Sequence, residues 1–159
     1  MTPHILFWAA FLSLTPISEL RGAIPYAVAN GMALLPAALW CVAWNALAGP
    51  IAYLFLSSVH KLLYRWKRYA SFFDRFVERA RAKVHESVEK YGYWGILVFV
   101  AVPLPLTGAW TGALGAWVLG MDRKKSMLAV AGGVLVAGVI VSLVVGLGVG
   151  ALSLFLKKV

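Results

Sequence analysis

Two long apolar runs, at 32–59 and 127–156, constrain this chain more than any other feature of its sequence. A helix needs roughly 20 apolar residues to cross a hydrocarbon core of about 30 Å, and both runs exceed that length. The composition agrees, because 62% of the residues are hydrophobic, only 13% are charged and the mean hydropathy is +0.82. We therefore expect a single all-α membrane domain over 1–159, without a soluble domain.

Two further apolar stretches are interrupted after about half a bilayer of helix. The stretch 5–14 is followed by 15–25, which holds two prolines, a glycine and two ionisable side chains. The stretch 94–102 is followed by 103–112, which holds two prolines and two glycines. Proline removes a backbone donor and clashes with the preceding turn, so each helix is expected to break in these segments.

The same order of elements occurs twice. In each half a short apolar leg, a broken segment and a second short leg ending in Gly-Met precede a long apolar run. We interpret this order as an internal duplication, with repeats at 1–59 and 94–159. Unpaired backbone groups cannot face lipid, so two matching breaks predict a site where the halves meet. We expect each broken segment to form a re-entrant hairpin, which makes the two halves inverted relative to each other.

The basic residues indicate the membrane topology. Nine of the fifteen Lys and Arg lie within 61–90, and three more lie at 123–125. With re-entrant hairpins both groups fall on one side, which the positive-inside rule assigns to the cytoplasm, whereas four complete crossings would separate them. We expect a multi-pass protein of the inner (plasma) membrane with a cytoplasmic linker at 60–93, and no nucleic-acid binding.

The linker has the period of an amphipathic helix. Its apolar side chains recur at intervals of three or four from Leu62 to Tyr91, and Arg, Lys and Glu fill the opposite face. Such a helix is predicted either to lie along the anionic cytoplasmic surface or to pack its apolar stripe on its own protein.

Glu19 and Arg21 are the ionisable side chains of the first broken segment. A charge at bilayer depth costs at least about 2.5 to 3.5 kcal/mol and is usually directed at a partner, a cavity or a substrate. Arg21 is predicted to bind an anionic head group through its forked donors, and Glu19 to exchange protons, because burial favours its neutral form. The alternative is structural: the two form a salt bridge, or cap a half-helix that begins near Gly22.

In the second broken segment hydroxyls and glycines replace the charges. Its half-helix N-terminus is predicted to cradle an anion or a phosphate, or only to let the hairpins approach closely. The candidate substrate-binding or coupling residues of both segments are Glu19, Arg21, Gly22, Pro25, Pro103, Pro105, Thr107, Gly108, Trp110, Thr111 and Gly112. We interpret Asn45 as an interhelical hydrogen-bonding residue, and the glycines of 127–156 as a packing face that favours a homodimer.

Patterns typical of enzymes and metal sites are absent from the sequence. Cys41 is the only cysteine, and His4, His60 and His85 lack the spacing of metal ligands. The sequence contains no nucleophile elbow, phosphate-binding loop or catalytic carboxylate pair. We expect no enzymatic activity, no metal and no cofactor other than a coupled proton or sodium ion.

The broken segments, PISELRGAIP at 16–25 and PLPLTGAWTGA at 103–113, resemble the paired signatures of the prokaryotic small multidrug export protein family. The resemblance covers nearly the whole chain. That family is similar to the DedA group, which implies two inverted re-entrant hairpins facing each other and the movement of lipid phosphates, such as undecaprenyl phosphate or phospholipids, coupled to protons or sodium. By position Glu19 and Arg21 match the first hairpin and 107–112 the second. The arginine of the second DedA hairpin has no counterpart here.

Three functions follow as expectations. The first is a transporter or flippase that receives an anionic amphiphile at Arg21 and 107–112, with Glu19 as the coupling acid. The second is export of cationic amphipathic compounds, with Glu19 as the binding residue and Arg21 as its partner. The third is a non-transporting membrane scaffold whose basic linker recruits anionic lipid or a protein partner.

Overall fold

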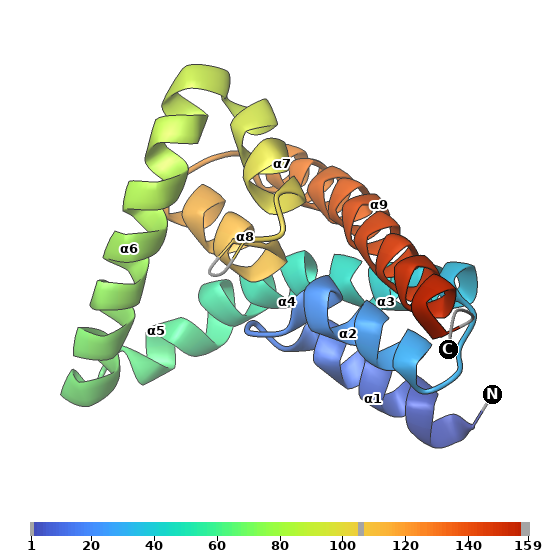
Figure 1. Ribbon diagram of the computed structural model, residues 1–159. Coiled ribbons are helices and arrows are strands. Elements are labelled where there is room, and N and C mark those ends of the chain that lie inside the picture. The colour runs from blue at the N-terminus through green and yellow to red at the C-terminus, as the bar shows by residue number, and fades with distance from the viewer. Residues whose placement is uncertain (1, 105–106, 157–159) are drawn as a thin grey trace.

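The computed structural model describes residues 2–104 and 107–156, and this part of the chain forms helices joined by short turns (Figure 1). The predicted all-helical class is confirmed over these residues. Two of the described helices are long and apolar enough to cross a membrane, Leu34–Ser58 and Arg123–Val149. They correspond to the two apolar runs of the sequence.

The first half is a helical hairpin followed by a long, irregular helix. The hairpin consists of α1 (Pro3–Leu14) and α2 (Glu19–Ala29), and the long helix of α3 (Leu34–Ala46), α4 (Ala48–Leu54) and a π-helical turn (Phe55–Val59). The interruption between α3 and α4 lies beside Pro50. Proline has no N–H to donate to the carbonyl of Ala46, four residues earlier, so the helix is irregular at this point.

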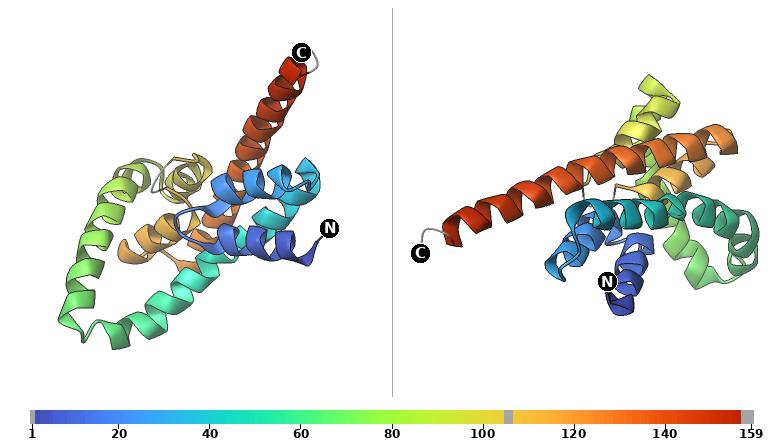
Figure 2. Two further views of the ribbon diagram at one scale, coloured as in Figure 1. Left: turned by 60° about the horizontal axis from the view of Figure 1, so that its bottom comes forward. Right: turned by 90° about the vertical axis from the view of Figure 1, so that its right-hand side faces the viewer.

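The second half has the same order of elements. Its hairpin consists of α7 (Tyr93–Ala101) and α8 (Ala109–Val118), and its long helix is α9 (Arg123–Leu156). The backbone is extended at Val102, as expected for a residue before proline, and this ends α7. At 34 residues α9 is about 50 Å long. Figure 2 shows its C-terminal part extending beyond the other helices.

The two long helices run antiparallel along most of their length. Four contacts define the register. Three of them involve glycines: Leu34 lies against Gly146, Val42 lies against Gly138, and Val130 lies against Gly49. In the fourth, the Arg123 guanidinium lies 5.9 Å from the ring centre of Tyr53. Small residues allow this close approach, as they do between membrane helices in general.

The first hairpin ends near the middle of the long helix beside it. The indole of Trp40 donates to the carbonyl of Leu6 at 3.0 Å, and the amide of Asn45 donates to the carbonyl of Ser13 at 2.6 Å. α1 therefore runs parallel to α3, and its last turn lies at the level of Asn45. The prediction that Asn45 forms an interhelical hydrogen bond is confirmed.

The second hairpin is placed in the same way on α9. At its start, the Tyr93 hydroxyl accepts from the backbone N–H of Asp122 at 3.3 Å, and the Lys125 ammonium lies 5.9 Å from the centre of the Tyr93 ring. Further along, Val100 packs directly on Gly133. α7 thus runs parallel to α9, and its end lies at the level of Gly133, near the middle of the candidate span Arg123–Val149.

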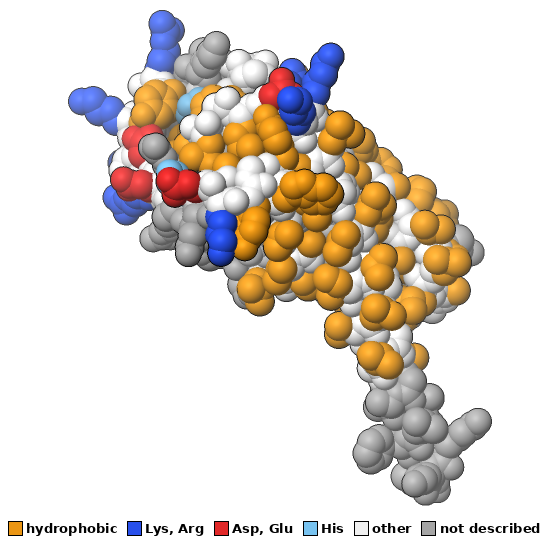
Figure 3. All heavy atoms as spheres, turned by 90° about the horizontal axis from the view of Figure 1, so that it is seen from above, with side chains coloured by type: hydrophobic (Ala, Val, Ile, Leu, Met, Phe, Trp, Pro, Cys, Tyr) orange, Lys and Arg blue, Asp and Glu red, His pale blue; other side chains and the backbone are white. Residues whose placement is uncertain are grey.

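The linker is helical, as predicted, but it is interrupted at 64–66 and forms two helices, α5 (His60–Leu63) and α6 (Lys67–Tyr91). α6 packs against α7 and α8, and Phe73, which is 9% exposed, lies in a cluster with Leu56 and Leu114. The apolar stripe therefore contacts the protein itself at this point. Figure 3 shows the charged side chains gathered at one end of the molecule, while the rest of that face is hydrophobic.

Two sequence predictions need correction. The first broken segment was expected to extend to Pro25, but α2 begins at Glu19, so Gly22 and Pro25 lie inside a helix. A proline in the second turn removes only the hydrogen bond to the carbonyl of Arg21, and the helix tolerates this loss. The second correction concerns the other broken segment, which was expected to extend to Gly112: α8 begins at Ala109, so Thr111 and Gly112 lie inside a helix. The glycines of α9 do form packing contacts, and at Gly132, Gly133, Gly138 and Gly146 these contacts lie within the chain.

Replacing Gly133 with Ala tests the close packing of α7 on α9. A Cβ at Gly133 would lie 2.6 Å from the Val100 side chain and 2.7 Å from the carbonyl oxygen of Leu97. We expect Gly133→Ala to lower the free energy of unfolding by about 1 to 3 kcal/mol in detergent denaturation, the usual cost of overpacking. Gly148→Ala is the matched control, because nothing lies within 4 Å of a Cβ there. Equal stability of the two variants would contradict this packing.

Candidate functional site

Glu19 begins α2 in an unusual backbone conformation. It is the one non-glycine residue with positive φ (47°) in the described part of the chain, and its side chain is only 7% exposed. Left-handed backbone is strained for most residues and persists where surrounding contacts hold it. Here the turn after α1 directs the Glu19 carboxylate away from its own hairpin and toward the second one.

The Glu19 carboxylate caps the N-terminus of α8. Its two oxygens accept from the backbone N–H groups of Ala109 at 3.2 Å and of Trp110 at 3.4 Å. These donors have no acceptor within α8, because the first N–H groups of a helix lack an intrahelical partner. The helix dipole also favours a negative charge at this end. Both hydrogen bonds are longer than the usual 2.9 to 3.0 Å, so the contact is weaker than a tight cap.

Gly108 makes this approach possible. It precedes α8 with φ 138°, a conformation that other residues rarely adopt. A Cβ at this position would overlap the carboxylate of Glu19, with its Cδ only 2.5 Å away. Only glycine at position 108 therefore leaves room for the carboxylate of Glu19, which stands 89 positions earlier in the chain.

A second hydrogen bond joins the same two hairpins. The indole Nε1–H of Trp110 donates to the carbonyl of Leu14, the last residue of α1, at 2.9 Å. Exposed carbonyls at a helix end need an external donor, as exposed N–H groups need an acceptor. Each hairpin thus supplies a side chain that satisfies the interrupted backbone of the other.

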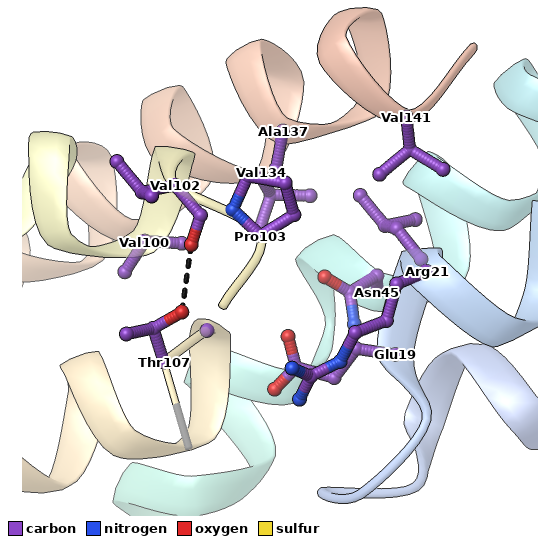
Figure 4. A pocket seen from close by; sticks show the side chains of 12 residues that line it. Glu19, Arg21, Asn45, Val100, Val102, Pro103, Thr107, Val134, Ala137 and Val141 are labelled. Carbon is purple, nitrogen blue, oxygen red and sulfur yellow. Dashed lines mark hydrogen bonds between the residues drawn. The ribbon is translucent and has the colours of Figure 1, made fainter. Parts of the chain in front are cut away.

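Arg21 follows Glu19 by two residues, and its side chain binds the loop between α7 and α8. Its guanidinium donates to the carbonyl of Leu104, and it forms no ion pair with Glu19. In Figure 4 the guanidinium lies beside the Glu19 carboxylate, on the same side of the pocket. The predicted Glu19–Arg21 salt bridge is therefore not formed, and Glu19 caps α8 instead of the half-helix near Gly22.

The predicted phosphate cradle of the second hairpin differs from the structure. The Thr107 hydroxyl lies 2.6 Å from the carbonyl of Val102 and 2.8 Å from that of Leu104, and Thr111 donates to the carbonyl of Gly108 at 3.3 Å. Both hydroxyls thus stabilise the local loop. The first two N–H groups of α8 are already bound by Glu19, which takes the place of an external anion.

A cavity of about 20 Å³ lies between the two hairpins and α9 (Figure 4). Glu19, Arg21, Asn45 and Thr107 contribute its polar side chains, and aliphatic side chains of α9 contribute part of the apolar wall: Val134, Ala137 and Val141. A cavity of this size has room for roughly one water molecule. A larger molecule therefore requires the hairpins to separate.

The structure brings about half of the predicted residues together. Five of them line the pocket: Glu19, Arg21, Pro103, Thr107 and Gly108. Of the others, Trp110 joins the two hairpins, and Thr111 donates a hydrogen bond within the first turn of α8. Gly112 packs closely on Val100, and Gly22 makes room for the Ser18 hydroxyl. Pro25 lies further along α2. Pro105 lies outside the described residues.

Sequence reasoning missed two contributors to the site. The carbonyl of Leu14 carries no side-chain signal, and the α9 wall consists of ordinary aliphatic residues within a long apolar run. The role of Gly108 had a detectable signal, since glycine directly before a helix often permits close backbone approach. Its partner Glu19 could not be identified from sequence spacing.

Residues 19–140 of the chain match the family described as "Putative small multi-drug export protein". The match begins at Glu19 and includes both pocket-lining segments and the apolar run of α9 as far as residue 140. No curated protein and no solved structure matches the chain.

Replacing Gly108 with Ala tests the contact between the hairpins. We expect a loss of more than about 2 kcal/mol in the free energy of unfolding, because the new Cβ combines backbone strain with a clash against Glu19. Gly120→Ala is the control for strain alone, since Gly120 also has positive φ (66°) but nothing lies within 4 Å of its Cβ. In the double variant Glu19→Ala, Gly108→Ala the clash disappears, so the two losses should be less than additive. Strict additivity would exclude the contact.

Proposed function

The chain belongs to the small multi-drug export family, and on this premise we propose that it exports small amphipathic cations in exchange for protons, without enzymatic activity. The observation that carries the proposal is the buried Glu19 carboxylate, held by two long hydrogen bonds at the meeting point of two broken helices. An ionisable group in such a place is usually functional in membrane proteins. The family name supports export, and the site suggests how a cation and a proton compete.

We propose that both hairpins are re-entrant and that the two halves are inverted. The antiparallel long helices support inversion, and the positions of Asn45 and Gly133 support hairpins that turn back near the middle of the bilayer. The contact of Tyr93 with Asp122 and Lys125 supports one common side for the linker and the turn before α9. By the positive-inside rule this side is the cytoplasm of an inner-membrane protein.

The proposed cycle depends on which partner the Glu19 carboxylate has. Ionised, it caps α8 and holds the hairpins together around the small pocket. A bound proton removes the charge that attracts the α8 N-terminus, so the hairpins separate and the pocket widens. An amphipathic cation then pairs with the carboxylate, which loses its proton, and the apolar wall of α9 covers the rest of the compound. Arg21 balances the charge of Glu19 while no substrate is bound.

A second candidate is the movement of an anionic amphiphile, such as a lipid phosphate, as in DedA-type flippases. The position of Arg21 in the pocket wall favours it. When Glu19 is protonated, the α8 N–H groups and the guanidinium become available to the same phosphate. In either case we propose a homodimer.

Proteoliposome transport with an imposed proton gradient separates these candidates. For cation export we expect Glu19→Gln to reduce transport of a fluorescent lipophilic cation at least tenfold, since the amide cannot ionise. Arg21→Ala is expected to retain a substantial fraction of this transport. Glu78→Gln, on the exposed face of α6, is the matched control. Movement of a fluorescent lipid phosphate that Arg21→Ala abolishes would favour the second candidate, and no transport above empty vesicles would favour the non-transporting scaffold.

Cysteine accessibility tests the proposed topology. In a Cys41→Ala background, we expect Ser71→Cys and Lys124→Cys to react with a membrane-impermeant maleimide only from the cytoplasmic side, and Thr2→Cys only from the opposite side. All three positions are exposed. Reaction of Ser71→Cys and Lys124→Cys from opposite sides would exclude the re-entrant arrangement.

A further inference from the structure

The first three turns of α6 carry a basic surface that the transport proposal does not use. Lys67, Arg68, Ser71 and Arg75 line an open hollow of about 370 Å³, and all four side chains are exposed. We refer to these four residues as the basic hollow. Their spacing of three, four and eight positions places them along one side of the helix.

The positive charges of the basic hollow are not neutralised by the described acidic residues. None of its three cations forms an ion pair with them, and Arg75 donates a long hydrogen bond of 3.5 Å to the Ser71 hydroxyl. Asp74, on the same turn as Arg75, accepts a hydrogen bond from the Tyr64 hydroxyl at 3.0 Å. The hollow therefore presents three cations and a hydroxyl to an external anion.

The basic hollow faces away from the protein core. At 100° per residue, Phe73 and Val77 lie roughly opposite the arc from Lys67 to Arg75. Phe73 and Val77 pack toward Leu56 and Leu114, so the far side of α6 is fixed against the helices of the membrane domain. The apolar stripe is thus already used, and the basic side remains for another partner.

Chain connectivity keeps this surface close to the membrane. The candidate span ends at Ser58, and α6 begins nine residues later, after the short α5. Between them stand two exposed aromatic residues, Tyr64 at 46% and Trp66 at 70% relative exposure. Exposed Trp and Tyr beside basic residues at the end of a spanning helix are typical of the lipid head-group region. A water-filled binding site for free phosphate would have no need of them.

We propose that the basic hollow, together with Trp66, binds the head group of an anionic phospholipid of the surrounding bilayer. The three cations and the Ser71 hydroxyl contact the lipid phosphate, and the indole lies at the boundary between head groups and acyl chains. This contact anchors the N-terminal end of α6, while Phe73 holds its other side against the membrane domain. The proposal does not depend on what passes through the pocket at Glu19.

Native mass spectrometry of the full chain in detergent, with added phosphatidylglycerol, tests the proposal. We expect the variant Lys67→Gln, Arg68→Gln, Arg75→Gln to lose phosphatidylglycerol binding by roughly tenfold or more. The variant Arg123→Gln, Lys124→Gln, Lys125→Gln removes the same charge from the other basic segment and is expected to retain most of the binding. We expect Trp66→Ala to show an intermediate loss. Because all the replaced side chains in the basic hollow are exposed, we expect this triple variant to have the same melting temperature as the unmodified protein.

Phosphatidylcholine and inorganic phosphate are the competing probes. We expect phosphatidylcholine to bind both proteins weakly and equally, and millimolar inorganic phosphate not to displace phosphatidylglycerol. Unchanged phosphatidylglycerol binding in the triple variant of the basic hollow would overturn the proposal. Equal losses in both triple variants would also overturn it, because they would indicate attraction by overall charge. Displacement of phosphatidylglycerol by inorganic phosphate would overturn it as well, because it would indicate a site for a free anion.

Discussion

The shortage of hydrogen-bond partners in lipid is the constraint on which this structure depends. Two short helices end after Leu14 and after Ala101, and each leaves backbone groups without a partner in its own helix, which hydrocarbon could not satisfy. The hairpins solve the problem jointly: Glu19 accepts from the N–H groups that begin α8, and Trp110 donates to the carbonyl that ends α1. The meeting point, the need for glycine at Gly108 and the small polar pocket all follow from this exchange.

The sequence predicted the helices well because their signals are local. Length and hydropathy identified the two spans, proline identified the breaks, and the period of three to four identified the linker helix. Family membership was predicted from the two broken segments, and residues 19–140 confirm it. The prediction that the hairpins are inverted and re-entrant remains a prediction, although the antiparallel register of α4 and α9 agrees with it.

The site was predicted only in part because its contacts cross between the halves. Glu19 and Arg21 were identified by the cost of burying charge, but the structure lacks the salt bridge that was the structural alternative. The carboxylate instead has a helix N-terminus as its partner, and Arg21 has the carbonyl of Leu104. Neither partner is visible as a side chain. The start of α2 was misplaced for a related reason: Pro25 looked like a helix breaker, yet its position costs α2 only one hydrogen bond.

The unequal exchange at the centre of the molecule has an evolutionary consequence. The duplication predicted from the sequence would start with identical halves, yet here one half provides the acid and the other provides the amide donors and the indole. Two copies of the first half would bring two carboxylates together, and two copies of the second would leave both sets of donors without an acceptor. The two halves are complementary in this contact, as the two chains of an obligate heterodimer are. Because both halves lie on one chain, every molecule carries the acid and its donors in equal number.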